Sequence, residues 1–177
     1  MFSFFRKKHK GTLVTDLVFI SGEAKLKAIT DKIRQSENIA VITWFDESFA
    51  VMEEQNASEN LFVDVHLART VTARDVKDKQ VIFFEHYPLH SKEIDLMEQL
   101  HLGATRFYSS LDEPLFKFFG GENISAMISK MGLSANEGIK HPLVTAAIKN
   151  AQENIQKKMT LEPSAASQEE WLRKAIG

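Results

Sequence analysis

Residues 104–158 read ATRFYSSLDEPLFKFFGGENISAMISKMGLSANEGIKHPLVTAAIKNAQENIQKK. Polar and apolar residues alternate over 105–109, and this period of two predicts a β-strand. Three segments with helical spacing of apolar residues follow. Asp112 precedes the first segment, Gly132 ends the second and Pro142 stands in the first turn of the third, and these residue types begin or end helices. The stretch therefore predicts one strand and three helices, with Asp112 as the cap of the first helix.

Upstream of this stretch, residues 12–103 alternate between short apolar runs and segments of helical spacing. Apolar strands that alternate with helices are typical of a parallel sheet covered on both faces. We therefore expect an α/β fold with a mainly parallel sheet of about five strands and helices on both faces. The expected strands are residues 13–20, 38–44, 61–67, 81–84 and 105–109. The expected helices follow Ser21, which is placed as a cap, and begin at Ser48 and Pro88.

The composition is that of one globular domain. A chain of 177 residues buries about 70% of its unfolded surface, so it needs no metal or disulfide to fold. The absence of cysteine excludes disulfides and thiolate chemistry, and it makes the cytoplasm the simplest compartment. The net charge of -2 creates no field that would attract nucleic acid. We expect no cofactor, no metal and no nucleic-acid partner.

Several short motifs of residues 104–158 occur together at a characteristic spacing. They are Arg106-Phe107-Tyr108, Ser110-Leu111-Asp112, Phe119-Gly120, Met131-Gly132, residues 141–145 and Asn150-Ala151-Gln152. In this combination the segment resembles the end of the second RecA-like ATPase domain of SecA, the preprotein translocase motor. The resemblance implies that residues 12–158 form a three-layer RecA-like half-domain, truncated and degenerate relative to the family's own. It thins upstream, where Glu23-Ala24-Lys25 is similar to the helix that opens the family's domain.

The sequence lacks the residues with which this family hydrolyses ATP. The phosphate-binding pattern G-x-x-x-x-G-K-[ST], which the family carries in its first ATPase domain, does not occur. The family's second domain supplies arginines that reach the γ-phosphate, but no arginine lies between Arg74 and Arg106. Such an arginine raises the rate of phosphoryl transfer by roughly three to five orders of magnitude. Asp64 imitates a magnesium-binding aspartate, but it is a weak signal without the phosphate loop. We expect no catalytic or nucleotide-binding residue, and no ATP hydrolysis by this chain alone.

The preferred function is therefore non-enzymatic. The sequence predicts the family's fold but lacks its residues for phosphate binding and hydrolysis. This combination indicates a protein-binding or adaptor module, which the resemblance links to preprotein translocation. The alternative is a nucleotide-binding or small-molecule-binding protein, or an enzyme, that reuses the crevice at the carboxyl ends of the strands. Related proteins share a fold more reliably than they share a function, so both alternatives stay open.

The loops that follow the strands of a parallel sheet meet at one edge, where ligands bind by default. In this sequence the loops predicted at that edge carry aromatic, acidic and basic side chains. The candidate crevice residues are Trp44, Asp46, Glu47, Arg69, Glu85, His86 and Asp112. The simpler interpretation is that they are ordinary loop residues.

A possible zinc site has to be weighed against a simpler interpretation. Glu85, His86, His90 and Glu93 include the ligand types that zinc prefers. Pro88 separates the two histidines, however, and the sequence does not define their geometry. We expect these four side chains to be solvent-exposed loop residues and to hold no metal.

The N-terminal residues 1–11 differ in composition from the body of the chain. They form an aromatic and basic arm, and its apolar run is too short for a signal peptide or a membrane span. The arm could contact a partner or an anionic membrane surface, which would place the protein in the cytoplasm, peripherally at the inner membrane face. The simpler interpretation, which we prefer, is a frayed terminus whose aromatic side chains dock on the body. The candidate contact residues are Phe2, Phe4, Phe5, Arg6, Lys7 and Lys8.

The last residues, 159–177, predict a linker and a short helical extension. The segment 159–167 reads MTLEPSAAS, a composition typical of a linker. The following helix carries Trp171 and Leu172 on its apolar stripe, and it is too short to be stable alone. It must dock on the body or on a partner, and we expect the body.

Overall fold

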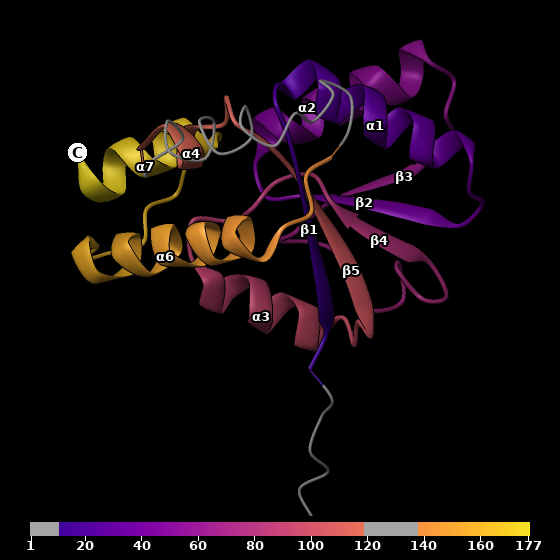
Figure 1. Cartoon of the computed structure of the whole chain (residues 1–177). Helices are drawn as coiled ribbons and strands as arrows, with labels where there is room; N and C mark the ends of the chain where they lie inside the picture. Colours follow the sequence, from indigo (N-terminus) through magenta and orange to yellow (C-terminus); the bar gives the residue numbers. More distant parts are fainter. Residues whose placement is uncertain (1–10, 119–137) are drawn as a thin grey trace, which may run out of the picture.

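A computed structural model describes residues 11–118 and 138–177 (Figure 1). Most of the N-terminal arm, residues 1–10, lies outside the described residues. The second helix predicted within residues 104–158, which carries Ile124 and Met131, lies outside them as well.

The centre of the fold is a sheet of five parallel strands, as the sequence predicted. The strands are β1 (Leu13–Phe19), β2 (Ile39–Thr43), β3 (Asp64–Leu67), β4 (Gln80–Phe83) and β5 (Ala104–Ser110). Their order across the sheet is β1-β5-β4-β2-β3, and every neighbouring pair is parallel. The strand β4 is central and nearly fully buried, which explains its continuous apolar sequence.

Helices cover both faces of this sheet, which gives the three layers of a RecA-like half-domain (Figure 1). On one face α1 (Gly22–Arg34) and α2 (Asp46–Ser58) bury Ile29 and Met52 against the sheet. On the other face α3 (His90–Gln99) buries Leu96 and Met97. The long helix α6 (Pro142–Lys158) packs beside α3 and buries Ile148 in a cluster with Val18 of β1.

The C-terminal helix docks on the body, as expected. The helix α7 (Gln168–Ile176) lies against the short helix α4 (Pro114–Phe118) and against α6. Trp171 and Leu172 of α7 are 1% and 0% exposed. Residues 159–167 contain no helix or strand and cross from α6 to α7. Among the described helices, none is both long and apolar enough to cross a membrane.

Two local predictions about strand and helix ends need correction. The third strand was predicted over 61–67 but begins at Asp64, because Phe62 has a φ of 55°, which is incompatible with an extended strand. Asp112 was predicted to cap the helix that follows it. Its Oδ2 instead accepts a hydrogen bond from the backbone N–H of Gly22, 2.9 Å away at the start of α1. The cap predicted at Ser21 is confirmed, because its Oγ accepts from the N–H of Ala24 at 3.2 Å.

The strand order creates a switch point between β2 and β4, which are neighbours in the sheet. The chain leaves β2 through α2 on one face and goes outward to β3, whereas it leaves β4 through α3 on the other face and goes to β5. Loops that diverge in this way leave a crevice between them, and ligands of α/β proteins bind there. The carboxyl ends of β2 and β4 are therefore the place to look for a site.

Candidate functional site

A crevice of about 500 Å³ opens at the carboxyl ends of β4 and β5. Its walls are the first turns of α1, α2 and α7 and the loop between β5 and α4. A helix begins with backbone N–H groups that have no partner within the helix, and its N-terminal end carries a partial positive charge. Several helix N-termini that meet at one crevice are suited to bind an anion.

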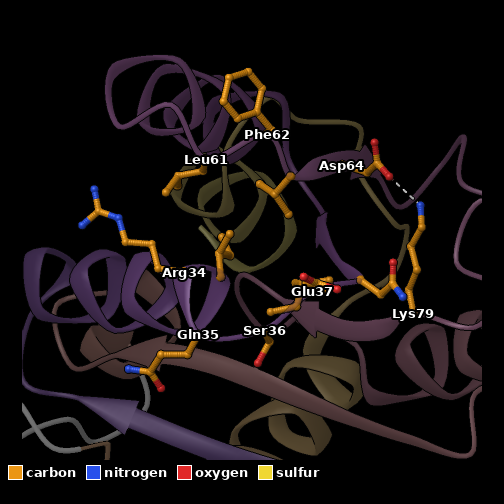
Figure 2. Close-up of a pocket in the computed structure, with 12 residues that line it drawn as sticks. Arg34, Gln35, Ser36, Glu37, Leu61, Phe62, Asp64 and Lys79 are labelled. Carbon is orange, nitrogen blue, oxygen red and sulfur yellow. Dashed lines mark hydrogen bonds and ion pairs between the residues drawn. The ribbon is translucent and has the colours of Figure 1, made fainter.

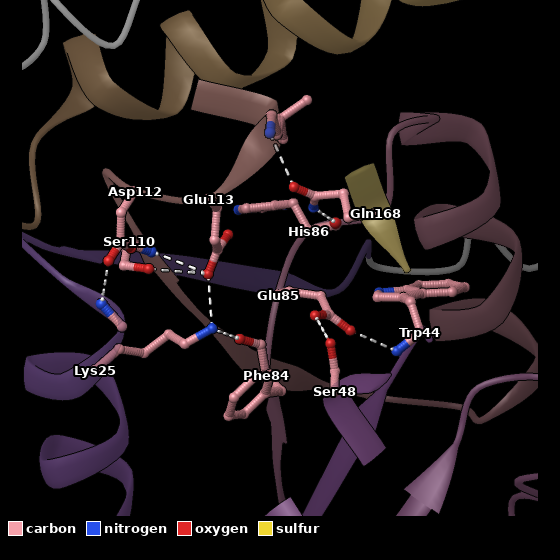
Figure 3. Close-up of polar contacts among 12 residues, drawn as sticks. Lys25, Trp44, Ser48, Phe84, Glu85, His86, Ser110, Asp112, Glu113 and Gln168 are labelled. Atoms are coloured by element: carbon pink, nitrogen blue, oxygen red, sulfur yellow. Dashed lines mark hydrogen bonds and ion pairs between the residues drawn. The ribbon is translucent and has the colours of Figure 1, made fainter. Parts of the chain in front are cut away.

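The only lysine deep in this crevice, among the described residues, already has its counter-ion (Figure 3). Lys25 of α1 is 4% exposed. Its Nζ donates to Oε1 of Glu113 at 2.6 Å and to the backbone oxygen of Phe84 at 2.9 Å. The same Nζ lies 3.7 Å from the centroid of the Phe84 ring. Lys25 is thus held by a carboxylate, a carbonyl and an aromatic face.

Glu85, which follows β4, is buried behind the crevice and joins β4 to α2. Its Oε1 accepts the backbone N–H of Trp44 at 2.9 Å, and its Oε2 accepts the hydroxyl of Ser48 (Figure 3). Burial raises the pKa of Glu85 to about 7, although the charge of Lys25 opposes this rise. Glu85 therefore changes its protonation state near neutral pH.

The loop after β5 caps its own backbone and that of α1. Oε1 of Glu113 accepts the N–H of Ser110 at 3.0 Å in addition to Lys25. Asp112 accepts the N–H of Gly22 at 2.9 Å. Burial would raise the pKa of Asp112, but its hydrogen bonds with Ser110 and Gly22 outweigh burial and lower it. Both carboxylates thus occupy donors that a bound anion would otherwise use.

His86 lies outside the crevice, in a buried ionic cluster between β1 and α3. Its Nδ1 is 2.8 Å from Oε1 of Glu93, and its Nε2 is 3.4 Å from Oδ1 of Asp16. Burial alone would lower the pKa of His86, but the carboxylates of Glu93 and Asp16 raise it to about 10. The imidazole is therefore a permanent cation at neutral pH, with a counter-ion on each side.

The prediction that Glu85, His86, His90 and Glu93 are exposed loop residues is wrong for Glu85, His86 and Glu93, whereas His90 is partly exposed and lies at the start of α3. Glu85, His86 and Glu93 are 4%, 3% and 2% exposed. Sequence alone could not show that Asp16, on the distant strand β1, supplies the second counter-ion. Within residues 11–118 and 138–177, no group of His, Asp and Glu has the arrangement of a metal site.

Helix α6 is attached to this ionic cluster by residues that belong to the SecA-like motifs. The hydroxyl of Thr145 donates to Oδ2 of Asp16 at 2.5 Å. The side-chain amide of Gln152 donates to the backbone oxygen of Tyr87 at 2.7 Å, and Gln152 is 1% exposed. These motif residues thus hold α6 against the sheet, so their observed role is structural.

The structure divides the predicted crevice residues among four places. Glu47, Glu85 and Asp112 line the crevice, and His86 lies in the ionic cluster. Trp44 and Arg69 line a second cavity beside α3. Asp46 lines neither cavity, and its carboxylate forms a bidentate ion pair with Arg69.

Sequence reasoning missed Lys25 and Ser48 as members of the crevice, and it placed the loop 110–113 at this edge without singling out Glu113. One signal could have identified Lys25, because it shares the spacing of the apolar stripe with Ile29 and Ile33 at i+4 and i+8. A lysine on the buried face of a helix needs a nearby acceptor. The partner, Glu113, stands 88 residues away and could not be identified from spacing.

A further cavity of about 520 Å³ lies at the opposite, amino-terminal edge of the sheet (Figure 2). Asp64 is at this edge, where it pairs with Lys79 at 2.5 Å. An ATPase aspartate for magnesium stands at the carboxyl end of its strand, near the phosphates. The position of Asp64 is therefore unsuited to that role.

Comparison with known proteins finds relatives for one region of the chain. No family model matches the sequence. The protein translocase subunit SecA of Acidithiobacillus ferrooxidans (strain ATCC 53993 / BNL-5-31) is 46% identical over 54 residues, which are 30% of this chain and 6% of that protein. The corresponding subunit of Syntrophus aciditrophicus is 42% identical over 55 residues, 31% of this chain and 6% of its own. The chain thus spans about 6% of the length of these curated relatives. Within that extent, this protein contains a SecA-related region.

Proposed function

We propose that this chain is a non-catalytic, SecA-related protein-binding module that acts in or beside preprotein translocation and does not hydrolyse ATP by itself. The SecA-related region supports the link to translocation. The loss of ATPase function is supported by the state of the crevice, where the chain's own carboxylates occupy the groups that would bind phosphate.

The observation that carries this proposal is the pairing of three backbone N–H groups with internal carboxylates. Gly22 donates to Asp112, Trp44 to Glu85 and Ser110 to Glu113, all at 2.9 to 3.0 Å. A phosphate site needs such N–H groups to be free and to point at the ligand. Here each one is used within the protein.

The charge of the crevice also opposes a triphosphate. Six carboxylate residues line it, against two lysines, one of which is already paired. A nucleotide would have to displace an internal carboxylate and then remain close to the others, and like charges at short range repel strongly. The carboxylates are Glu23, Glu47, Glu85, Asp112, Glu113 and Glu169, and the lysines are Lys25 and Lys117.

We propose a protein partner for the module, and a peripheral membrane contact through the arm that carries Phe2, Phe4, Phe5, Arg6, Lys7 and Lys8. An acidic crevice favours a basic segment of a partner over an acidic one, because complementary potentials steer association. The arm has the opposite charge, and it combines aromatic with basic side chains, as interfacial membrane anchors do.

The test is a calorimetric titration of the purified chain with ATP and ADP in the presence of magnesium, together with a turnover assay. We expect neither binding nor turnover. A ligand present at about 100 times its dissociation constant would add roughly 2.7 kcal/mol to the free energy of unfolding, so thermal denaturation provides an independent measurement. Saturable ATP turnover that disappears in Glu85→Gln would overturn the proposal.

The translocation link has its own test, which uses purified SecA from the same organism. We expect a saturable complex that weakens as salt is raised, because the proposed contact is electrostatic. The double variant Glu47→Gln/Glu169→Gln should weaken it, since both residues line the crevice without an ion pair within the described residues. An affinity that is the same for this variant would place the contact elsewhere on the chain.

A second candidate function is a small-molecule enzyme that uses the crevice, and Glu85 favours it. A buried carboxyl with a pKa of about 7 beside an open cavity has the properties of a general acid or base. Both oxygens of Glu85 are already bonded to Trp44 and Ser48, however, which leaves it poorly placed to exchange a proton with a substrate. We therefore rank this candidate below the binding module.

A further inference from the structure

A cavity of about 690 Å³ lies at the amino-terminal edge of the sheet, opposite the acidic crevice. Its walls are the loop that leads into β4 and the turn between α3 and β5, and it shares no lining residue with the crevice. Its charged lining consists of three basic residues and one carboxylate residue. They are Arg74, Lys77, Lys79 and Asp78. This edge of the molecule is therefore basic where the crevice is acidic.

Two of the three cations are exposed and unpaired. Arg74 and Lys77 belong to none of the ion pairs formed among the described residues, whereas Lys79 is already paired. The carboxylate of Asp75, on the same loop, is engaged locally, because it accepts the backbone N–H and the hydroxyl of Thr72 at 2.8 and 2.7 Å. Arg74 and Lys77 are thus available to an anionic partner.

The base of the N-terminal arm is hydrogen-bonded to the wall of this cavity. The hydroxyl of Thr12 donates to the backbone oxygen of Leu102 at 2.7 Å. The backbone N–H of Leu13 donates to the oxygen of Gly103 at 3.0 Å. Both acceptors line the cavity, and β1 begins at this edge (Figure 1). The arm and the cavity therefore belong to one edge of the molecule.

The length of the arm keeps its charges near this edge. Its basic residues Arg6, Lys7, Lys8 and Lys10 all lie within five residues of Gly11. An extended chain spans at most about 3.5 Å per residue, so these cations stay within about 18 Å of Gly11. The crevice lies beyond the far end of β1, and a strand of this length spans about 20 Å. A surface that the arm reaches is therefore closer to the amino-terminal edge than to the crevice.

Exposed apolar side chains accompany these cations. Leu13 and Val14, at the start of β1, are 68% and 37% exposed. Apolar residues beside basic ones are typical of surfaces that rest on anionic lipid, where the apolar groups enter the headgroup region and the cations meet the phosphates.

We propose that the amino-terminal edge of the sheet, with Leu13, Arg74 and Lys77, lies on an anionic lipid membrane together with the arm, so that the acidic crevice faces away from the membrane. This inference rests on the membrane contact of the proposed function, to which it adds residues of the folded body and an orientation. In this orientation the crevice stays open to a protein partner while the protein is on the membrane.

Binding of the full chain to vesicles of phosphatidylglycerol and phosphatidylcholine in equal parts tests the basic residues of this edge. Arg74→Gln/Lys77→Gln should weaken binding roughly 20-fold, because each basic residue close to an anionic surface contributes about fivefold. The matched control is Lys149→Gln/Lys157→Gln, which makes the same change of charge at exposed positions of α6. Equal effects of the two double variants would mean that only net charge matters and would overturn the proposal.

The apolar part of the edge has a similar pair of variants. Leu13→Glu places a negative charge at the proposed contact and should weaken vesicle binding about tenfold or more. Leu161→Glu makes the same change at an 81% exposed position between α6 and α7, and it should have little effect. A Leu13→Glu protein that binds as tightly as the Leu161→Glu protein would exclude Leu13 from the contact.

The orientation can be measured with a single fluorophore, because the chain has no cysteine of its own. Ala104→Cys places a label beside the basic cavity, and Val51→Cys places one at the crevice. Anionic vesicles should shield the label at Ala104→Cys from iodide in the water and leave the label at Val51→Cys accessible. Equal shielding of the two labels would contradict the orientation.

The arm variant Arg6→Gln/Lys7→Gln/Lys8→Gln distinguishes failure of this inference from failure of the proposed function. Loss of binding in the arm variant, with full binding by Arg74→Gln/Lys77→Gln, would mean that the arm acts alone, and it would refute the role of the body while the membrane contact stands. If the parent chain binds anionic vesicles no better than vesicles of phosphatidylcholine alone, both are refuted.

Discussion

Nζ of Lys25 lies 2.6 Å from Oε1 of Glu113, and the two side chains are only 5% and 11% exposed. The first residue belongs to α1 and the second to the loop before α4, so this ion pair joins two parts of the chain that are 88 residues apart. It also occupies the cation that a nucleotide would need in the crevice. The pair therefore links α1 to the loop before α4, and under the proposed function it also opposes the binding of phosphate.

Glu113→Gln is expected to lower the free energy of unfolding by about 3 to 5 kcal/mol, because it leaves the buried ammonium of Lys25 without its counter-charge. Chemical denaturation at neutral pH measures this loss. The double variant Lys25→Met/Glu113→Gln should recover most of it, since no buried charge then remains unpaired. Equal losses in the single and double variants would mean that the ion pair itself matters little.

The control for this experiment is Asp31→Asn. Its carboxylate pairs with Lys27 at 2.5 Å, but the two side chains are 42% and 63% exposed. An exposed pair contributes less than about 1 kcal/mol. A large effect of this control would indicate that the denaturation assay responds to net charge and not to burial.

Glu85→Gln is expected to stabilise the protein above neutral pH. Burial raises the pKa of Glu85 from 4.5 to about 7, so between these values the folded chain holds a proton that the unfolded chain has released. Its contribution to the free energy of unfolding therefore falls as pH rises through this window, by about 3 kcal/mol in all. The variant should match the parent near pH 4 and exceed it near pH 8.

Unfolding curves recorded at intervals across this pH range measure the effect of Glu85. Glutamine keeps an acceptor for Trp44 and gains a donor for Ser48, so it fits the same contacts. If parent and variant change with pH in parallel, Glu85 is not the titrating group.

His86→Gln is expected to destabilise the protein most at low and neutral pH. The carboxylates of Glu93 and Asp16 overcome burial and raise the pKa of His86 from 6.5 to about 10. A raised pKa means that the stabilisation is fully present below pH 6.5 and is lost as pH rises through 10. The variant leaves two buried carboxylates without a cation, and we expect a loss of about 3 to 5 kcal/mol at pH 6.

Two measurements check the role of His86. A histidine titration by nuclear magnetic resonance should find this imidazole still protonated at pH 8. Denaturation of the variant should lack the decline that the parent shows between pH 6.5 and 10. An imidazole that titrates near its ordinary pKa would refute the ionic cluster.

Trp171→Ala is expected to cost about 3 to 5 kcal/mol, the usual range for a large aromatic residue removed from a core. Trp171 is 1% exposed and its indole donates to Tyr87, so the variant also loses a hydrogen bond. Thermal denaturation measures the loss. Leu161→Ala is the matched control, because Leu161 is 81% exposed and its removal should have almost no effect. A small effect of Trp171→Ala would mean that α7 adds little to the stability of the body.

The elements of the fold were predictable because they depend on local patterns. The strands β1, β2 and β4 follow apolar runs of strand length, β5 follows an alternation of polar and apolar residues, and α6 begins at Pro142 as a first-turn proline predicts. The start of β3 was missed because Phe62 adopts a left-handed conformation, which sequence gives no reason to expect from a bulky residue. Predictions for residues 1–10 and for the helix near Ile124 remain predictions.

The sequence by itself determined the α/β class, the relationship of one region to SecA and the absence of a phosphate-binding loop, because each depends on periodicity or on motifs of neighbouring residues. Tertiary structure alone decided how charges meet. Lys25 with Glu113, and His86 with Asp16, are pairs between distant parts of the chain, whereas Glu93 is only seven residues from His86. Strand order brings such residues together, and a buried charge depends on the groups that surround it in space. The crevice was therefore located by its loops, whereas the hydrogen bonds from its backbone N–H groups to internal carboxylates became visible only in the folded chain.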